Sequence, residues 1–113
     1  MKEIKAIIQP SMLTKVILAL KSHPGLPGVT VSEVKGFGKS RAKDAKNKIE
    51  HESVDYAPKA KLEIVVPDGA WKEVSEIILK AAHTGSPGDG KIFVYDVAEV
   101  LKISTGERGD RAI

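Results

Sequence analysis

The chain has 113 residues, of which 18 are Lys or Arg and 15 are Asp or Glu, so its net charge is only +3. This length fits one domain with a single core. Because acidic and basic residues are interleaved and only 4% of residues are aromatic, we expect neither a polyanion-binding surface nor a platform for stacking bases, which argues against nucleic-acid binding. The chain has no cysteine, which excludes disulfides and fits a cytoplasmic protein. No apolar run approaches the roughly 20 residues of a membrane span, so no direct membrane insertion is expected.

The first part of the chain predicts a strand, a helix and a second strand. Residues 2–9 are rich in isoleucine and end at Pro10, which cannot donate to a sheet ladder. Residues 12–22 have an apolar face at helical spacing, and Ser11 is placed to cap that helix. The face consists of Leu13, Val16, Ile17 and Leu20. Alternating valines from residue 29 then predict a strand that runs to Gly36-Phe37-Gly38.

The second part repeats this order after a charged interruption. Residues 39–58 have almost nothing apolar to bury, and a loop of that length in a compact domain is usually functional. A solvated charged excursion without a partner is the alternative. Residues 61–66 predict the third strand, and 92–100 predict the fourth. Between them an amphipathic helix is predicted from Ala70, and it ends at His83-Thr84-Gly85. Residues 101–113 are a polar tail with a short apolar start.

The resulting order is β-α-β, long loop, β-α-β. It predicts an α+β domain, a ferredoxin-like split βαβ sandwich with a four-stranded antiparallel sheet and both helices on one face. The opposite face of the sheet then needs another cover. In an oligomer that cover is a second subunit.

A glycine-rich loop joins the second helix to the last strand. It reads Thr84-Gly85-Ser86-Pro87-Gly88-Asp89-Gly90-Lys91, and its small residues expose backbone N–H groups beside one fixed cation, as a phosphate site requires. A P-loop is not expected, because Ile92 stands where a magnesium-binding hydroxyl would be and a strand follows instead of a helix. An ordinary glycine-rich connection remains the alternative.

No specific catalytic pattern or metal-ligand spacing is present. His23, His51 and His83 lie in separate connections, where loop or cap roles are favoured over metal binding, although His51-Glu52 leaves a metal contact open. Lys91 could polarise a phosphate, but it has no positioned base beside it. The sequence therefore predicts ligand binding, without a catalytic residue.

The loop at 84–94 and several other segments resemble the PII signal-transduction proteins (nitrogen regulatory protein P-II) from end to end. The matching segments are Thr84 through Val94, Ile7-Ile8 with Pro10, Thr30-Val31, Glu33 through Gly38, Pro58-Lys59, Lys61 through Pro67, and Thr105-Gly106-Glu107. The resemblance implies a homotrimer that binds ATP or ADP in clefts between its subunits, with Mg²⁺ left open. It also implies a T-loop at about 39–57, a B-loop at about 84–91 and a C-terminal loop at about 101–113.

The resemblance also implies which residues form the nucleotide site. In the pocket these are Thr30, Gly36, Phe37, Gly38, Lys39, Glu63 and Val65; around the phosphates they are Thr84, Gly88, Asp89, Gly90 and Lys91, with Lys102 contributed by the neighbouring subunit. Lys102 stands where the family usually has arginine, and Ser104 and Ser86 replace further cations. We therefore expect weaker or altered selectivity among ATP, ADP and AMP.

The predicted T-loop departs from the family at its functional positions. Glu52 and Glu50 replace the tyrosine and serine that relatives have modified, so we expect no modification there. Ser40 replaces a glutamine that helps to chelate magnesium and 2-oxoglutarate, whereas Lys59, the contact to that keto acid's carboxylate, is retained. Binding of 2-oxoglutarate stays open, because a hydroxyl is a weaker ligand than an amide carbonyl.

These features predict a divergent PII-type regulator, primarily not an enzyme, whose T-loop controls a transporter or a metabolic enzyme in nitrogen-related or transport regulation. One alternative is a trimeric structural or metal-tolerance protein of the same fold without nucleotide sensing; a second is a weak ATPase. We expect Lys91→Ala and Gly90→Ala to abolish nucleotide binding and leave the trimer folded.

Overall fold

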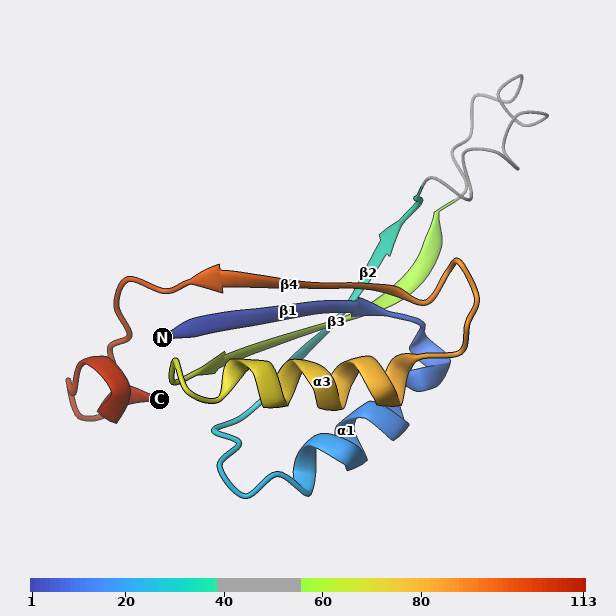
Figure 1. Cartoon of the computed structure of the whole chain (residues 1–113). Helices are drawn as coiled ribbons and strands as arrows, with labels where there is room; N and C mark the ends of the chain where they lie inside the picture. Colours follow the sequence, from blue (N-terminus) through green and yellow to red (C-terminus); the bar gives the residue numbers. More distant parts are fainter. Residues whose placement is uncertain (39–55) are drawn as a thin grey trace.

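The structure is a computed structural model, and it describes residues 1–38 and 56–113. The described residues form four strands, two α-helices and two short 3₁₀ helices (Figure 1). In chain order these are β1 (Lys2–Ile8), η1 (Pro10–Met12), α1 (Leu13–Lys21), β2 (Thr30–Gly36), β3 (Ala57–Val66), α3 (Trp71–Ala82), β4 (Gly90–Asp96) and η3 (Gly109–Ala112). Their order is the one that the sequence predicts.

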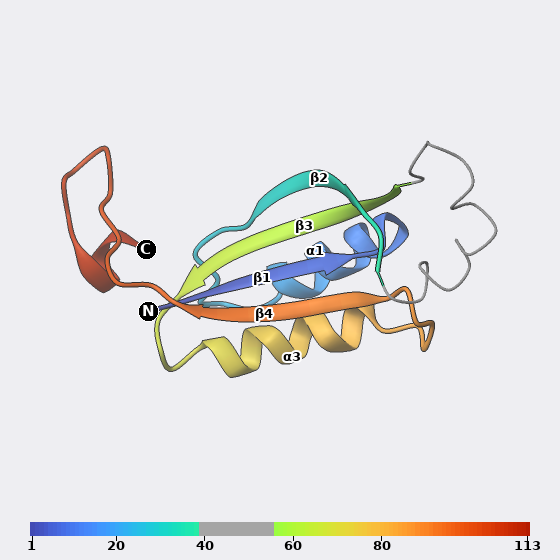
Figure 2. The ribbon, with the colours of Figure 1, turned by 90° about the horizontal axis from the view of Figure 1, so that it is seen from above.

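The four strands form one sheet in the order β2-β3-β1-β4, with every neighbouring pair antiparallel (Figure 2). Strand β1 is central: its Ile4 pairs with Ile64 of β3 on one side and with Val94 of β4 on the other. Both helices lie on the same side of this sheet (Figure 1). The predicted split βαβ sandwich is confirmed.

Strict alternation gives the sheet one apolar face, toward the helices. On β1 and β3 the buried and half-buried residues alternate, and the helix-facing set is Ile4, Ala6, Ile8, Ala60, Leu62, Ile64 and Val66. The helices complete the core with Val16 and Leu20 from α1 and Val74, Ile78, Ala81 and Ala82 from α3. Each buried Leu, Ile or Val contributes about 1.5–3 kcal/mol relative to an exposed position. The core is therefore the layer between the helices and this face.

The opposite face of the sheet, which we call the open face, has no helix over it among the described elements. Its side chains are polar or only partly buried: Glu3, Lys5 and Ile7 on β1, Lys59, Lys61, Glu63 and Val65 on β3, and Lys91, Phe93 and Tyr95 on β4. Phe93 and Tyr95 are each about two-fifths exposed, at 38% and 42%. Large aromatic side chains so exposed on one sheet face favour a protein partner over that face.

The largest differences from the predicted element boundaries are at two strand ends, and a predicted helix cap is also absent. Strand β3 begins at Ala57, four residues before the predicted start at 61. The last residue of the loop predicted over 39–57 therefore belongs to this strand. Strand β4 spans Gly90–Asp96 and not 92–100, because its ladder with β1 ends where Lys2 pairs with Asp96. Ser11 does not cap α1: it lies inside η1, and neither helix start has a side-chain cap.

The C-terminal tail is more ordered than a polar tail would be. Leu101 and Arg108 form an isolated antiparallel bridge, and the Lys102 N–H donates to the Glu107 carbonyl at 2.9 Å. Gly106 closes the turn with a φ of 75°, a left-handed conformation that favours glycine. The short helix η3 follows and ends the chain. The tail therefore forms a small hairpin at the end of the sheet where β1 begins (Figure 1).

Candidate functional site

The glycine-rich loop at 84–91 is held in shape by a carboxylate inside it. Asp89 Oδ2 accepts hydrogen bonds from the backbone N–H groups of Thr84 at 2.7 Å and Gly85 at 2.9 Å. Its Oδ1 accepts the Thr84 hydroxyl, and that hydroxyl oxygen accepts the Ser86 N–H at 3.2 Å. These bonds from the Thr84 hydroxyl and backbone lower the pKa of Asp89 below its usual 3.8. The loop is thus preorganised by an internal acceptor.

This geometry gives Asp89 a structural position in the loop that the sequence did not indicate. A carboxylate repels phosphate, so its internal bonds to Thr84 and Gly85 are a better account of an acid in an anion-binding loop than direct ligand contact. Lys91 is the second residue of the strand that follows, and it is exposed on the open face. It remains the cation that this loop offers to an anion.

Gly90 is fixed by the sheet. Its φ is 107°, and a Cβ built on it would lie 1.8 Å from the carbonyl oxygen of Ile7 on β1. Only glycine therefore allows β4 to start its ladder at this point. This contact argues against our expectation that Gly90→Ala acts on nucleotide binding alone, since the substitution strains the sheet before it acts on any ligand.

The carbonyl of Gly88 ties the loop to the sheet. It accepts a hydrogen bond from Gln9 Nε2 at 2.7 Å and another from Lys59 Nζ at 3.1 Å. The structure thus places the predicted Lys59 against the predicted loop. The sequence analysis did not identify Gln9. The only feature that could have indicated it is an amide side chain placed between the last residue of β1 and Pro10.

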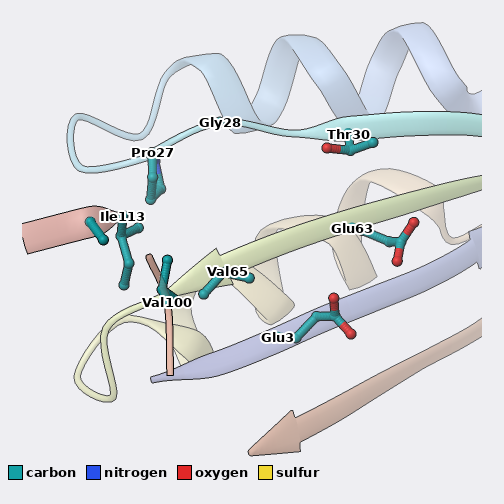
Figure 3. Close-up of a pocket in the computed structure, with 9 residues that line it drawn as sticks. Glu3, Pro27, Gly28, Thr30, Glu63, Val65, Val100 and Ile113 are labelled. Carbon is teal, nitrogen blue, oxygen red and sulfur yellow. The ribbon is translucent and has the colours of Figure 1, made fainter. Parts of the chain in front are cut away.

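A second group of predicted residues lines a pocket at the other end of the sheet. Thr30, Glu63 and Val65 lie together there, in a pocket of about 490 Å³ (Figure 3). The remaining lining residues are Glu3, Pro27, Gly28, Val100, Ala112 and Ile113. The pocket combines apolar side chains with carboxylates on neighbouring strands, so it suits a flat apolar group that carries hydrogen-bond donors.

The predicted nucleotide residues therefore fall into two groups, one at the end of the sheet where β4 begins and one that extends from the middle of β1, where Glu63 pairs with Lys5, to the end where β1 begins. Thr30 begins β2 and Gly36 ends it, six residues further on, which at about 3.3 Å per residue separates them by roughly 20 Å. Gly36 and the 84–91 loop lie at the end where β4 begins, whereas the pocket and the C-terminal hairpin that carries Lys102 lie at the end where β1 begins (Figure 1). One chain does not bring the two groups together.

The residues nearest the predicted T-loop are only partly described. Phe37 and Gly38 follow β2, and the Phe37 ring packs against the Tyr56 ring with centroids 5.9 Å apart. The predicted site residue Lys39, the Ser40 position and the Glu50 and Glu52 positions all lie outside the described residues.

On the open face a lysine side chain lies close to two aromatic rings. Lys5 Nζ lies 5.2 Å from the centroid of the Phe93 ring and 4.9 Å from that of Tyr95, within cation–π range. The interaction with Tyr95 raises the pKa of Lys5. Lys61 Nζ lies 3.6 Å from Glu63 Oε1.

Within residues 1–38 and 56–113, no three His, Asp or Glu side chains gather as a metal site requires. Over the same residues, no helix has the length and apolar character needed to cross a membrane.

Comparisons with known proteins agree in one family. The family described as nitrogen regulatory protein P-II matches residues 1–107. Nitrogen regulatory protein P-II 1 of Escherichia coli K12 is 48% identical over 113 residues, which cover all of both chains. The P-II protein of Rhodospirillum rubrum is 46% identical over the same length. The crystal structure of Arabidopsis thaliana PII bound to citrate matches with a TM-score of 0.80 and 38% identity, over 99% of this chain and 91% of that one.

Proposed function

The chain belongs to the nitrogen regulatory protein P-II family, and from that premise we propose that it binds ATP or ADP between the subunits of a homotrimer and regulates a partner protein through residues 39–57. The observation that supports this proposal most is the separation of the predicted nucleotide residues into two groups. In this proposal each group of residues forms one half of the nucleotide site, which we call a half-site. A cyclic trimer brings the loop end of one subunit against the pocket end of the next.

The open face supports the same assembly. Its half-exposed rings at Phe93 and Tyr95, with Lys5 between them, form a surface that a second copy of the chain covers. In a cyclic arrangement each subunit uses two different edges, so every cleft joins unlike ends of two neighbours. Three equivalent clefts follow from three subunits.

In this proposal the two half-sites bind different parts of the nucleotide. Lys91 and the backbone of Gly36–Gly38, with Lys39, contact the phosphates of the ligand. In the neighbouring subunit Glu63 accepts from the amino group of the base and Val65 packs against the ring. Lys102 is carried by the C-terminal hairpin at that same pocket end, and it supplies a second cation without the fork of an arginine. Mg²⁺ accompanies the phosphates, and 2-oxoglutarate would contact Lys59.

The regulated partner is a transporter or a metabolic enzyme in the cytoplasm, reached through residues 39–57. Ligand occupancy beside the ends of that segment shifts its conformational equilibrium, which is the signal that the partner reads. The proposed role is regulation, and weak ATP hydrolysis would be incidental to it. A trimer that tolerates metal without binding nucleotide is the competing role, and it predicts stabilisation by a divalent metal alone.

Subunit mixing tests the shared site directly. Lys91→Ala removes the loop cation, and Glu63→Ala removes the pocket acceptor, which lies on β3 opposite the middle of β1. Each variant alone should fail to bind ATP. After the two are unfolded and refolded together, about one cleft in four combines an intact loop with an intact pocket, because each cleft draws its halves independently from a 1:1 mixture.

The expected result is ATP binding by the mixture at about a quarter of the wild-type capacity, with wild-type affinity. Thr14→Val, an exposed change on α1, is the matched control and should bind as the unmodified protein does. If the mixture binds no ATP while refolded wild-type protein does, the two half-sites belong to one subunit and the proposed cleft is wrong.

A further inference from the structure

Gly88 lies near the end of the 84–91 loop, and its carbonyl oxygen is a meeting point of three segments. Gln9 comes from the end of β1 and Lys59 from β3, and their side-chain nitrogens lie 2.7 and 3.1 Å from that oxygen. A carbonyl oxygen has two lone pairs, so these two donors use its full capacity. The loop is thereby fixed to the two central strands at a single atom.

The two donors respond differently to an anion. The Lys59 ammonium forms stronger hydrogen bonds with an anionic acceptor than with a neutral carbonyl, so an arriving phosphate or carboxylate draws it away from Gly88. The Gln9 amide is neutral and has the shorter bond. Its position is also set by its own backbone, because the Gln9 carbonyl accepts the Met12 N–H at 3.0 Å as η1 begins. Gln9 therefore stays on Gly88 when Lys59 leaves.

The contact between Gln9 and Gly88 depends on both residue types. A Cβ at position 88 would lie 2.8 Å from Gln9 Nε2, so any larger residue there would displace the amide. The amide must also present its NH₂ group, since its oxygen would face the Gly88 oxygen and be repelled. Glycine at 88 and a donor at 9 are thus a matched pair.

We propose that Gln9 is a positioning residue for the 84–91 loop, and that it holds the Gly88 carbonyl while Lys59 is released to an anionic ligand. This inference rests on the proposed nucleotide cleft, and it goes beyond that proposal by assigning a role to a side chain outside the predicted site. Gln9 keeps the loop in its binding conformation in both states of Lys59. Affinity then depends on a group that does not touch the ligand.

The first test needs no ligand. Gln9→Met keeps the length of the side chain and removes the donor, Gln9→Lys restores a donor, and Thr14→Val is the control. Amide hydrogen exchange of the 84–91 segment should be about five-fold faster in Gln9→Met, at the wild-type rate in Gln9→Lys, and unchanged in the control, because one net hydrogen bond is lost. Equal exchange in Gln9→Met and wild type overturns the inference.

A double-mutant cycle with Lys59→Met separates positioning from simple destabilisation. In the Lys59→Met background the Gly88 carbonyl has only Gln9, so adding Gln9→Met should accelerate loop exchange by more than it does in the wild type. Equal factors in the two backgrounds would mean that the two donors do not share one acceptor. Exchange elsewhere, for example in α3, should not change in any variant.

ATP affinity is the second readout. The dissociation constant of Gln9→Met should rise about five-fold while that of Gln9→Lys stays within two-fold of wild type, with equal unfolding midpoints. If wild type and Gln9→Met bind ATP equally, this inference fails and the proposed function stands. If wild type binds no ATP, the proposed function fails and this inference fails with it.

Discussion

Gly90 offers a prediction whose size can be worked out from the structure. In Gly90→Ala, the new Cβ would lie 1.8 Å from the Ile7 carbonyl oxygen, whereas real Cβ atoms keep at least 3.0 Å. Strands β1 and β4 must separate to make that room, which strains or breaks the first pair of their ladder at a cost of about 1–3 kcal/mol. The φ of 107° adds about 1–2 kcal/mol for a residue with a Cβ.

Alanine substitutions at two further glycines separate the steric cost at Gly90 from the cost of its positive φ. Gly85 also has a positive φ, 92°, but nothing lies within 4 Å of its built Cβ, so Gly85→Ala isolates the backbone term. Gly69 has neither a positive φ nor a neighbour within 4 Å, so Gly69→Ala should change stability by less than about 0.5 kcal/mol. The three alanine variants therefore form a graded series.

Thermal unfolding at equal protein concentration measures the series. We expect no clear shift for Gly69→Ala, a decrease of about 5–10 °C for Gly85→Ala and one of about 15 °C or more for Gly90→Ala. Equal midpoints for the Gly85 and Gly90 variants would refute the reasoning, because they would show that β1 and β4 do not approach as closely as the Ile7 contact requires.

Two other predictions concern acid stability and assembly. Because bonds from Thr84 lower the pKa of Asp89 below 3.8, the stability that they give is present above that value and is lost as the pH falls through the lower folded-state pKa. Asp89→Asn should thus be less stable than wild type at about pH 6, and the difference should disappear as the pH falls through the lowered folded-state pKa; a difference that stays constant as the pH falls would contradict this. Phe93→Lys places a second cation beside Lys5 on the open face. Light scattering should show a fall from three times 12.1 kDa to 12.1 kDa, while Leu18→Lys on the exposed side of α1 keeps the trimer; a trimer in both would contradict assembly through the open face.

Apolar periodicity is sufficient to predict the layers of this fold. Isoleucines on β1 and the helical spacing on α3 place the core residues correctly, because the pattern of burial repeats along each element. The ends of the strands are harder to predict from the sequence, since they depend on pairing with a neighbouring strand. The sequence stays apolar at Val97 and Val100, yet the ladder of β4 with β1 stops where Asp96 pairs with Lys2, and only one further bond follows, from the Val97 N–H to the Met1 carbonyl at 3.1 Å.

The candidate site is predictable only in part for a similar reason. The 84–91 loop is visible in its glycines, but the bond from Gln9 to Gly88 joins residues 79 positions apart, and no local pattern indicates it. The position of Asp89 inside its own loop follows from turn geometry that residue type alone leaves open. The separation of the site into two ends of a sheet appears only once the register of β2 and β3 is known.

Isothermal titration of the purified protein with ATP, ADP and AMP, each with magnesium, tests the central claim most directly. The account predicts binding of ATP or ADP at about one site per chain, and loss of that binding in Lys91→Ala with the solution mass unchanged. No heat of binding with any of the three nucleotides, from a protein that is folded and trimeric, would contradict it.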